Sequence, residues 1–226
     1  MKHILLILLI ISALFIVGCT EEVIPETPII ELSEPAQVIF YAEDNTQLTG
    51  IVWNNKNSDK GIVLLHMAGN SKDDYTVLAQ VLQQAGYGVF MFDFRGHGYS
   101  SGGSWTSFSD EDWLNLEKDV KAAVKFMKRK GTYPRIGLLG ASIGANHALK
   151  YAITDDEVES LVLLSPGEEF KGVSIVSLAT NYLNPVLLVS AYDDEYSSTT
   201  VTQIYNELTG EKELEIFDEA GHGSNM

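Results

Sequence analysis

Residues 134–149 read PRIGLLGASIGANHAL, and this stretch decides the fold. An apolar run that begins at Ile136 stops at Gly140, and Ser142 then stands midway between Gly140 and Gly144, where helical spacing resumes. A serine at this junction predicts a sharp, strained turn from a buried strand into a helix, in which bulk two residues before or after it would clash. We therefore expect an exposed hydroxyl beside the N-terminus of the helix. An N-cap serine with glycines for close packing is the alternative interpretation.

The composition is that of one globular domain. The chain has 226 residues, of which 45% are hydrophobic and 20% charged, which is enough for a substantial core. The formal net charge of -16 argues against a nucleic-acid partner, because phosphate backbones are bound by Lys and Arg.

The chain alternates between strand-like and helix-like segments, which predicts an α/β fold with a mostly parallel sheet and helices on both faces. Ligands of such sheets lie at the carboxyl ends of the strands. The sequence predicts a first hairpin from the strands 37–42 and 47–53, then strands at 61–66, 88–93, 135–139, 158–164, 186–190 and 213–217. It predicts helices from a capping box at Ser71 and Asp74 to Gly86, from a capping box at Ser109 and Asp112 over 110–130, and over 143–154 and 199–208.

The first residues indicate export. Residues 1–18 combine Lys2 with an apolar run too short to span a membrane, which is typical of a signal peptide. The ending Ile16-Val17-Gly18-Cys19 resembles a prokaryotic lipobox, which implies that Cys19, the only cysteine, is lipidated and anchors the exported protein to a membrane surface. An uncleaved anchor or a plain secretory signal is the alternative. Residues 19–36 then form the anchor and an acidic, Pro-containing tether, and residues 37–226 form the domain.

Gly140-Ala141-Ser142-Ile143-Gly144 resembles the nucleophile elbow of the α/β-hydrolase family. The run from Asp93 to Ser100, DFRGHGYS, matches a further loop signature of that family, in which we expect Asp93 and Arg95 to make scaffold contacts. The resemblance covers 37–226 and is greatest to small lidless esterases of the dienelactone-hydrolase type. Only about twenty residues separate the strand that ends near Leu164 from the next one, so we expect no cap domain. The family usually continues into a final helix, whereas four residues follow His222 here, so either the sequence is a fragment or the domain lacks that helix.

The family order of nucleophile, acid and base implies a Ser142–Asp194–His222 triad. His222 lies between two glycines after the last predicted strand, and it follows both Ser142 and the acid candidates. The count from the end of the strand at 186–190 favours Asp194 over Asp193, with Glu195 third. Of the other histidines, His66 and His97 could lie near the site, His147 is expected to be a packing or surface residue, and His3 belongs to the signal.

The loop His66-Met67-Ala68-Gly69-Asn70 resembles the family's His-Gly-X-Gly loop, with Met67 in place of the first glycine. The resemblance implies that the backbone amides of Ala68 and Ile143 form the oxyanion hole.

These residues predict a lipid-anchored serine hydrolase that cleaves small carboxylic esters through an acyl-enzyme. A thioesterase or peptidase with the same triad, and an inactive surface-anchored binding protein, are the alternatives. We predict no cofactor and no metal, because the sequence contains no metal-ligand cluster, phosphate loop or dinucleotide fingerprint.

Overall fold

The computed structural model describes residues 33–131 and 133–226. The predicted signal peptide, Cys19 and all but the last residues of the tether lie outside this part of the chain, so the predictions of export and lipidation remain predictions. Among the described residues, no helix combines the length and the apolar character that crossing a membrane would require.

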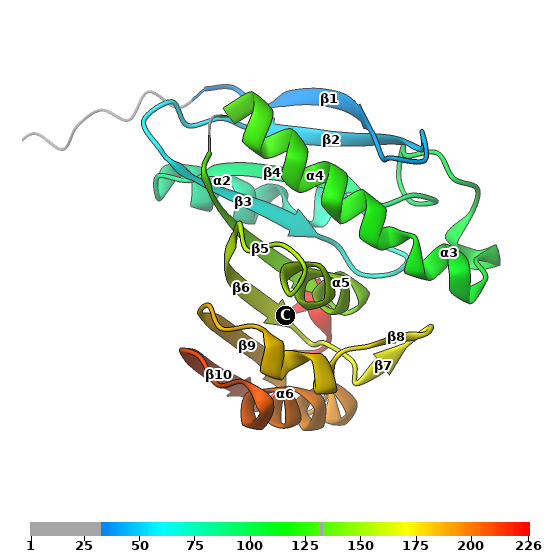
Figure 1. The fold of residues 1–226 in the computed structure, drawn as a ribbon, viewed down its shortest axis with the longest axis vertical. Coiled ribbons are helices and arrows are strands. Elements are labelled where there is room, and N and C mark those ends of the chain that lie inside the picture. Colours follow the sequence, from blue (N-terminus) through cyan, green and yellow to red (C-terminus); the bar gives the residue numbers. More distant parts are fainter. Residues whose placement is uncertain (1–32, 132) are drawn as a thin grey trace, which may run out of the picture. The chain divides into compact units, whose positions relative to one another are not determined.

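One eight-stranded sheet organises the domain, with the strand order β1-β2-β4-β3-β5-β6-β9-β10 (Figure 1). β1 pairs antiparallel with β2, β2 pairs antiparallel with β4, and the remaining pairs are parallel. The predicted α/β fold with a mostly parallel sheet is therefore confirmed. The strands are β1 (Ala36–Tyr41), β2 (Gln47–Trp53), β3 (Lys60–Leu65), β4 (Gly88–Asp93), β5 (Arg135–Ala141), β6 (Val158–Leu164), β9 (Val186–Ala191) and β10 (Lys212–Phe217).

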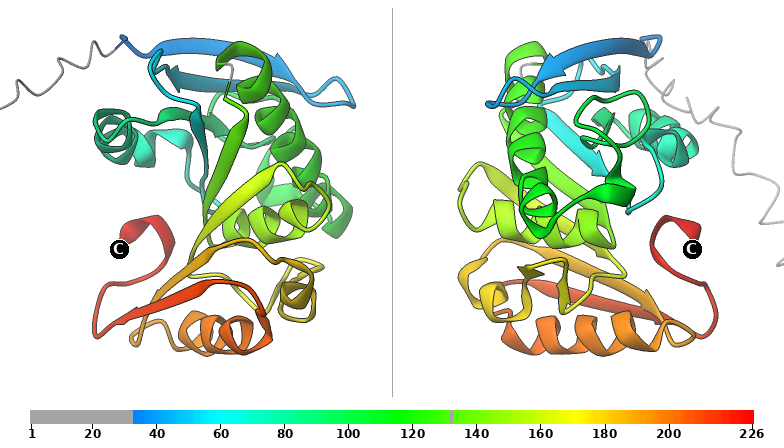
Figure 2. Two further views of the ribbon diagram at one scale, coloured as in Figure 1. Left: turned by 60° about the vertical axis from the view of Figure 1, so that its left-hand side comes forward. Right: turned by 90° about the vertical axis from the view of Figure 1, so that its right-hand side faces the viewer.

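Helices cover the two faces of the sheet unequally. α2 lies on one face, and α4, α5 and α6 lie on the other (Figure 2). The larger core forms under those three helices and includes Phe90, Phe92 and Leu138, whereas α2 covers a smaller cluster around Leu64 and Met91. The helices are α2 (Thr76–Gln84), α3 (Asp110–Leu114), α4 (Leu116–Gly131), α5 (Ile143–Ala152) and α6 (Glu195–Glu207), with short 3-10 turns η1 (Lys72–Tyr75), η2 (Trp105–Ser107), η3 (Val176–Asn181) and η4 (Gly223–Asn225).

Three of the predicted helices differ from those observed. The predicted helix 110–130 is interrupted at Asn115, so that Trp113 of α3 packs against Phe170 while α4 faces the sheet. Ser71 caps the 3-10 turn η1 through the Asp73 amide, in place of the capping box that we predicted. α6 begins four residues earlier than predicted, because Asp194 caps it. The capping box at Ser109 is present as predicted.

The segment between β6 and β9 contains a small hairpin, β7 (Glu169–Phe170) with β8 (Val173–Ser174), and the turn η3. We did not predict this hairpin from the sequence. It lies at the carboxyl end of β6, where a larger insertion would form a cap. The whole segment between β6 and β9, Ser165–Pro185, is too short for a cap domain.

Buried ion pairs hold the loop after β4. Asp93 accepts hydrogen bonds from the Lys72 amide and ammonium, both at 2.9 Å, and from the Tyr99 amide at 3.0 Å. Arg95 donates to Asp119 at 2.7 Å and to Asp44 at 2.8 Å. These contacts give Asp93 and Arg95 the scaffold role that we expected, because the charged groups of both side chains are occupied by ion pairs and hydrogen bonds.

Two fully buried histidines are kept neutral by the fold. His66 Nδ1 lies 2.8 Å from the Met67 carbonyl and Nε2 accepts the Phe94 amide at 3.0 Å, so Nδ1 carries the single ring proton. Burial lowers the pKa of His66 to about 4. Burial and the nearby Lys150 lower the pKa of His147 to about 3, and this residue is a packing residue in the core beside Phe94.

The free energy of unfolding should therefore fall as the pH drops from 6.5 toward 4. In this window the unfolded chain protonates both histidines whereas the folded chain does not, which costs about 1.4 kcal/mol per pH unit for each. His147→Leu should reduce the slope by one proton, as measured by urea unfolding at pH 6, 5 and 4. A slope equal to that of the wild type would show that His147 is protonated in the folded chain.

Candidate active site

Ser142 lies in a strained turn between β5 and α5. Its backbone has φ 52° and ψ -121°, a combination that a residue with a side chain adopts only at a cost. Its amide donates to the Leu164 carbonyl at 2.9 Å, which ties the turn to the end of β6. The residue is half-buried and lies at the carboxyl edge of the sheet, where the sequence predicts an accessible hydroxyl.

The two glycines permit a close backbone approach. A Cβ on Gly140 would lie 2.3 Å from the Gly144 carbonyl oxygen. A Cβ on Gly144 would lie 2.3 Å from the Leu65 carbonyl oxygen and 2.7 Å from that of His66. Glycine at 144 thus lets the start of α5 press against the end of β3.

This approach brings together the two loops of the predicted oxyanion hole. Ile143 precedes Gly144, and Ala68 lies two residues after His66. Neither the Ile143 nor the Ala68 amide donates a hydrogen bond to another described residue. Ile143 is also the first residue of α5, where free amides and the helix dipole favour a negative charge.

His66 is not a base in this site. Its two ring nitrogens are both used by backbone groups, and the ring lies buried beneath the loop that it begins. His97 is likewise buried, with Nδ1 2.9 Å from the Arg95 carbonyl and its ring stacked on Trp105. Both histidines support the loops behind the elbow.

His222 and Asp194 meet at the carboxyl edge. His222 Nδ1 lies 2.6 Å from Asp194 Oδ2, and the other carboxylate oxygen of Asp194 accepts the Ser197 amide at the start of α6. Burial acts to raise the pKa of Asp194, but the hydrogen bonds from His222 and Ser197 outweigh it and lower the pKa below its usual range. The carboxylate therefore stays charged and accepts a hydrogen bond from His222 Nδ1–H. The other ring nitrogen, Nε2, then points away from Asp194 and is the atom that can exchange a proton.

Asp193 has a different partner. Its carboxylate accepts the amides of Ala220 and Gly221 at 3.2 Å, and so holds the loop that carries His222. Asp194 therefore binds the imidazole of His222, and Asp193 binds the backbone of the loop that carries this imidazole.

The His222 loop passes directly beside the elbow. A Cβ on Gly223 would lie 2.8 Å from Met67 Sδ and 3.5 Å from the Cβ of Ala141, the residue before Ser142. Among the described residues, neither the Ser142 hydroxyl nor His222 Nε2 forms a hydrogen bond, so the contact between nucleophile and base is open in this structure. Contacts of this kind often close only when substrate binds.

Asn146 is a site residue that the sequence analysis did not single out. It lies one helical turn after Ser142, fully buried, and its side-chain amide donates to the Gly167 and Val173 carbonyls at 3.0 and 3.2 Å. Its oxygen accepts the Gly167 amide at 3.0 Å. Its position four residues from the nucleophile is the only signal in the sequence that could have pointed to it.

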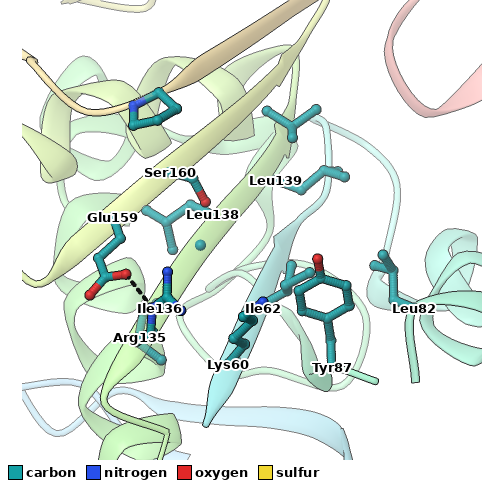
Figure 3. Close-up of a pocket in the computed structure, with 14 residues that line it drawn as sticks. Lys60, Ile62, Leu82, Tyr87, Arg135, Ile136, Leu138, Leu139, Glu159 and Ser160 are labelled. Carbon is teal, nitrogen blue, oxygen red and sulfur yellow. Dashed lines mark hydrogen bonds and ion pairs between the residues drawn. The ribbon is translucent and has the colours of Figure 1, made fainter. Parts of the chain in front are cut away.

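A cavity of about 430 Å³ lies elsewhere, on the face of the sheet that carries α2 (Figure 3). It is lined by apolar side chains such as Ile62, Leu82 and Leu139, with the Arg135–Glu159 ion pair at its edge. It contains neither Ser142 nor His222, so we do not assign the chemistry to it.

The sequence of the chain is similar to those of several known proteins. The chain is 25% identical to a carboxylesterase of Bacillus subtilis, over 74% of this chain and 86% of that protein. It is 29% identical to the uncharacterized protein YfhR of Salmonella typhi over 52% of this chain, and 32% identical to protein phosphatase methylesterase 1 of Candida albicans over 46%. The chain spans 40% and 28% of the lengths of the latter two proteins.

Solved structures show the same fold. An esterase of Pyrococcus furiosus, Pf2001, superposes with a TM-score of 0.69 at 23% identity, over 82% of each chain. A dienelactone hydrolase of Anabaena variabilis superposes with a TM-score of 0.68 at 18% identity, over 84% of this chain and 88% of that one. The eight-stranded sheet is thus that of an α/β-hydrolase.

The family described as serine aminopeptidase S33 matches residues 56–180, more than half of the chain. The matched segment begins just before β3 and ends within η3, and so contains Ser142, the hairpin β7–β8 and both loops of the predicted oxyanion hole. The protein belongs to this family of α/β-hydrolases.

Proposed function

We propose that the protein hydrolyses small carboxylic esters, with Ser142 as nucleophile, His222 as general base and Asp194 as the orienting acid. The observation that carries the proposal is the 2.6 Å hydrogen bond between His222 Nδ1 and Asp194 Oδ2, on a loop that passes beside the strained Ser142 turn. The similarity to a carboxylesterase over most of both chains supports the ester as substrate.

The reaction follows from the roles of these groups. Ser142 Oγ bonds to the ester carbonyl carbon while its proton passes to His222 Nε2, and the carbonyl electron pair moves onto oxygen, which the Ala68 and Ile143 amides stabilise. When that pair returns, the C–O bond to the alcohol breaks, and the alcohol leaves with the proton from Nε2. Water then attacks the acyl-enzyme by the same steps, which releases the acid and restores Ser142.

The architecture favours small substrates. Only the hairpin β7–β8 and η3 separate β6 from β9, so no cap provides an apolar wall for a long acyl chain. Each methylene left in water forgoes about 0.8 kcal/mol of binding.

The family description suggests amide cleavage by the same residues as a second candidate. A peptidase must in addition bind the charged amino terminus or the peptide backbone of its substrate, which a simple ester does not require. Assays with p-nitrophenyl acetate and with amino-acid p-nitroanilides separate the two activities.

Ser142→Ala should lower ester hydrolysis by roughly 10⁴-fold or more, because the hydroxyl forms the covalent bond. The fold should be unchanged, because the Ser142 side chain makes no hydrogen bond among the described residues. Assays with p-nitrophenyl acetate and circular dichroism spectra test both parts. Near-normal turnover by a folded variant would rule out Ser142 as the nucleophile.

Asp194→Asn should cost far more activity than Asp193→Asn, by roughly 10²-fold to 10⁴-fold against less than tenfold. The amide introduced at position 194 would present a donor to His222 Nδ1 and so favour the wrong tautomer, whereas an amide oxygen at position 193 can still accept from Gly221. The comparison is of kcat at saturating ester. If the Asp193 variant proves the less active, the roles of the two carboxylates are reversed.

A further inference from the structure

In the proposed reaction, the oxyanion hole and His222 together determine in which direction the acyl group of the substrate extends. During the first step the carbonyl oxygen occupies the oxyanion hole, and the leaving oxygen must lie near His222 to receive its proton. The acyl group therefore extends away from His222. The C-terminal segment that carries His222 meets the oxyanion loop at Met67, where a Cβ on Gly223 would lie 2.8 Å from Sδ.

The hairpin is tied to the nucleophile's own helix. The strand that precedes it ends at Leu164, whose carbonyl accepts the Ser142 amide. Asn146 then binds both arms of the segment, at Gly167 and at Val173. These bonds hold the hairpin beside the elbow.

Aromatic rings connect the hairpin to the oxyanion loop. Phe170 of β7 packs edge-on against Trp113, with centroids 5.7 Å apart, and Trp113 packs against Trp105 at 6.5 Å. Trp105 in turn touches the oxyanion loop, since a Cβ on Gly69 would lie only 3.1 Å from its Cζ2. We name these three residues, Trp105, Trp113 and Phe170, the aromatic arc, and it connects the oxyanion loop at Gly69 to the hairpin β7–β8.

Within the arc, Trp105 is both rigid and accessible. Its indole lies nearly parallel to the His97 ring, with centroids 5.6 Å apart, and its half-buried position leaves part of the ring open. Trp113, by contrast, is buried. A ring already held in place loses little conformational entropy when a second ring packs against it.

We infer that Trp105 is the specificity-determining residue of the site, and that the preferred acyl group is a compact one that carries an aromatic ring. The inference rests on the proposed ester hydrolysis. A planar ring gains offset or edge-to-face contacts with the indole that a flexible alkyl chain of similar reach does not. Its compact size also suits a site without a cap.

The test compares p-nitrophenyl 3-phenylpropanoate with p-nitrophenyl hexanoate, whose carbonyl groups have matched reactivity because each bears a CH₂. The wild type should prefer the phenylpropanoate in kcat/KM. Trp105→Leu keeps an apolar side chain but removes the indole ring. It should lower kcat/KM for the phenylpropanoate by roughly fivefold to tenfold, through a higher KM. It should change kcat/KM for the hexanoate by less than threefold. Trp105→Phe should retain most of the preference.

Tyr41→Ala is the matched control, because Tyr41 is an exposed aromatic residue on the edge strand β1, and it should alter neither substrate. Parallel losses for both esters in Trp105→Leu, or a wild type without preference, would overturn the role of Trp105 while leaving ester hydrolysis intact. Failure of the proposed function is distinct, since the wild type would then cleave neither ester. If the Leu variant does not fold, loss of the preference in Trp105→Phe would also contradict the inference.

Discussion

The close approach of the Gly144 backbone to the carbonyl groups of Leu65 and His66 is the contact on which the site depends. Any side chain at this position would overlap the backbone of β3 and push α5 away from it. The Ile143 and Ala68 amides would then separate, and the strained Ser142 turn would lose the packing that holds it. Packing around the turn thus offsets the strain energy of the positive φ at Ser142.

The loops around this contact are held mainly by buried polar groups that take no part in the proposed reaction. His66 fixes the oxyanion loop through two backbone hydrogen bonds, and the Lys72–Asp93 pair fixes the start of η1 against the end of β4. Removing one partner of such a buried pair leaves an uncompensated charge, which is costly. The positions of the proposed catalytic groups therefore depend on residues that never touch substrate.

The sequence predicted the parts of the molecule that local patterns determine. The apolar runs of the strands and the glycines around Ser142 each have a direct backbone consequence, so the sheet and the elbow could be anticipated. The hairpin β7–β8 could not, because its two-residue strands depend on Asn146 and on the packing of Phe170 against Trp113, which are contacts distant in sequence. The count from the strand at 186–190 favoured Asp194 over Asp193, whereas the hydrogen bonds that separate their roles, to His222 and to Gly221, come from a loop distant in sequence.

The central claim is that Ser142 forms a covalent acyl-enzyme beside the amides of Ala68 and Ile143. The most direct measurement is rapid acid quenching during turnover of p-nitrophenyl acetate, followed by mass spectrometry of the digested protein. The account predicts an acetyl group on the peptide that contains Ser142, formed within the burst of p-nitrophenol release. An acetyl group found on another side chain during steady turnover, with Ser142 unmodified, would contradict it.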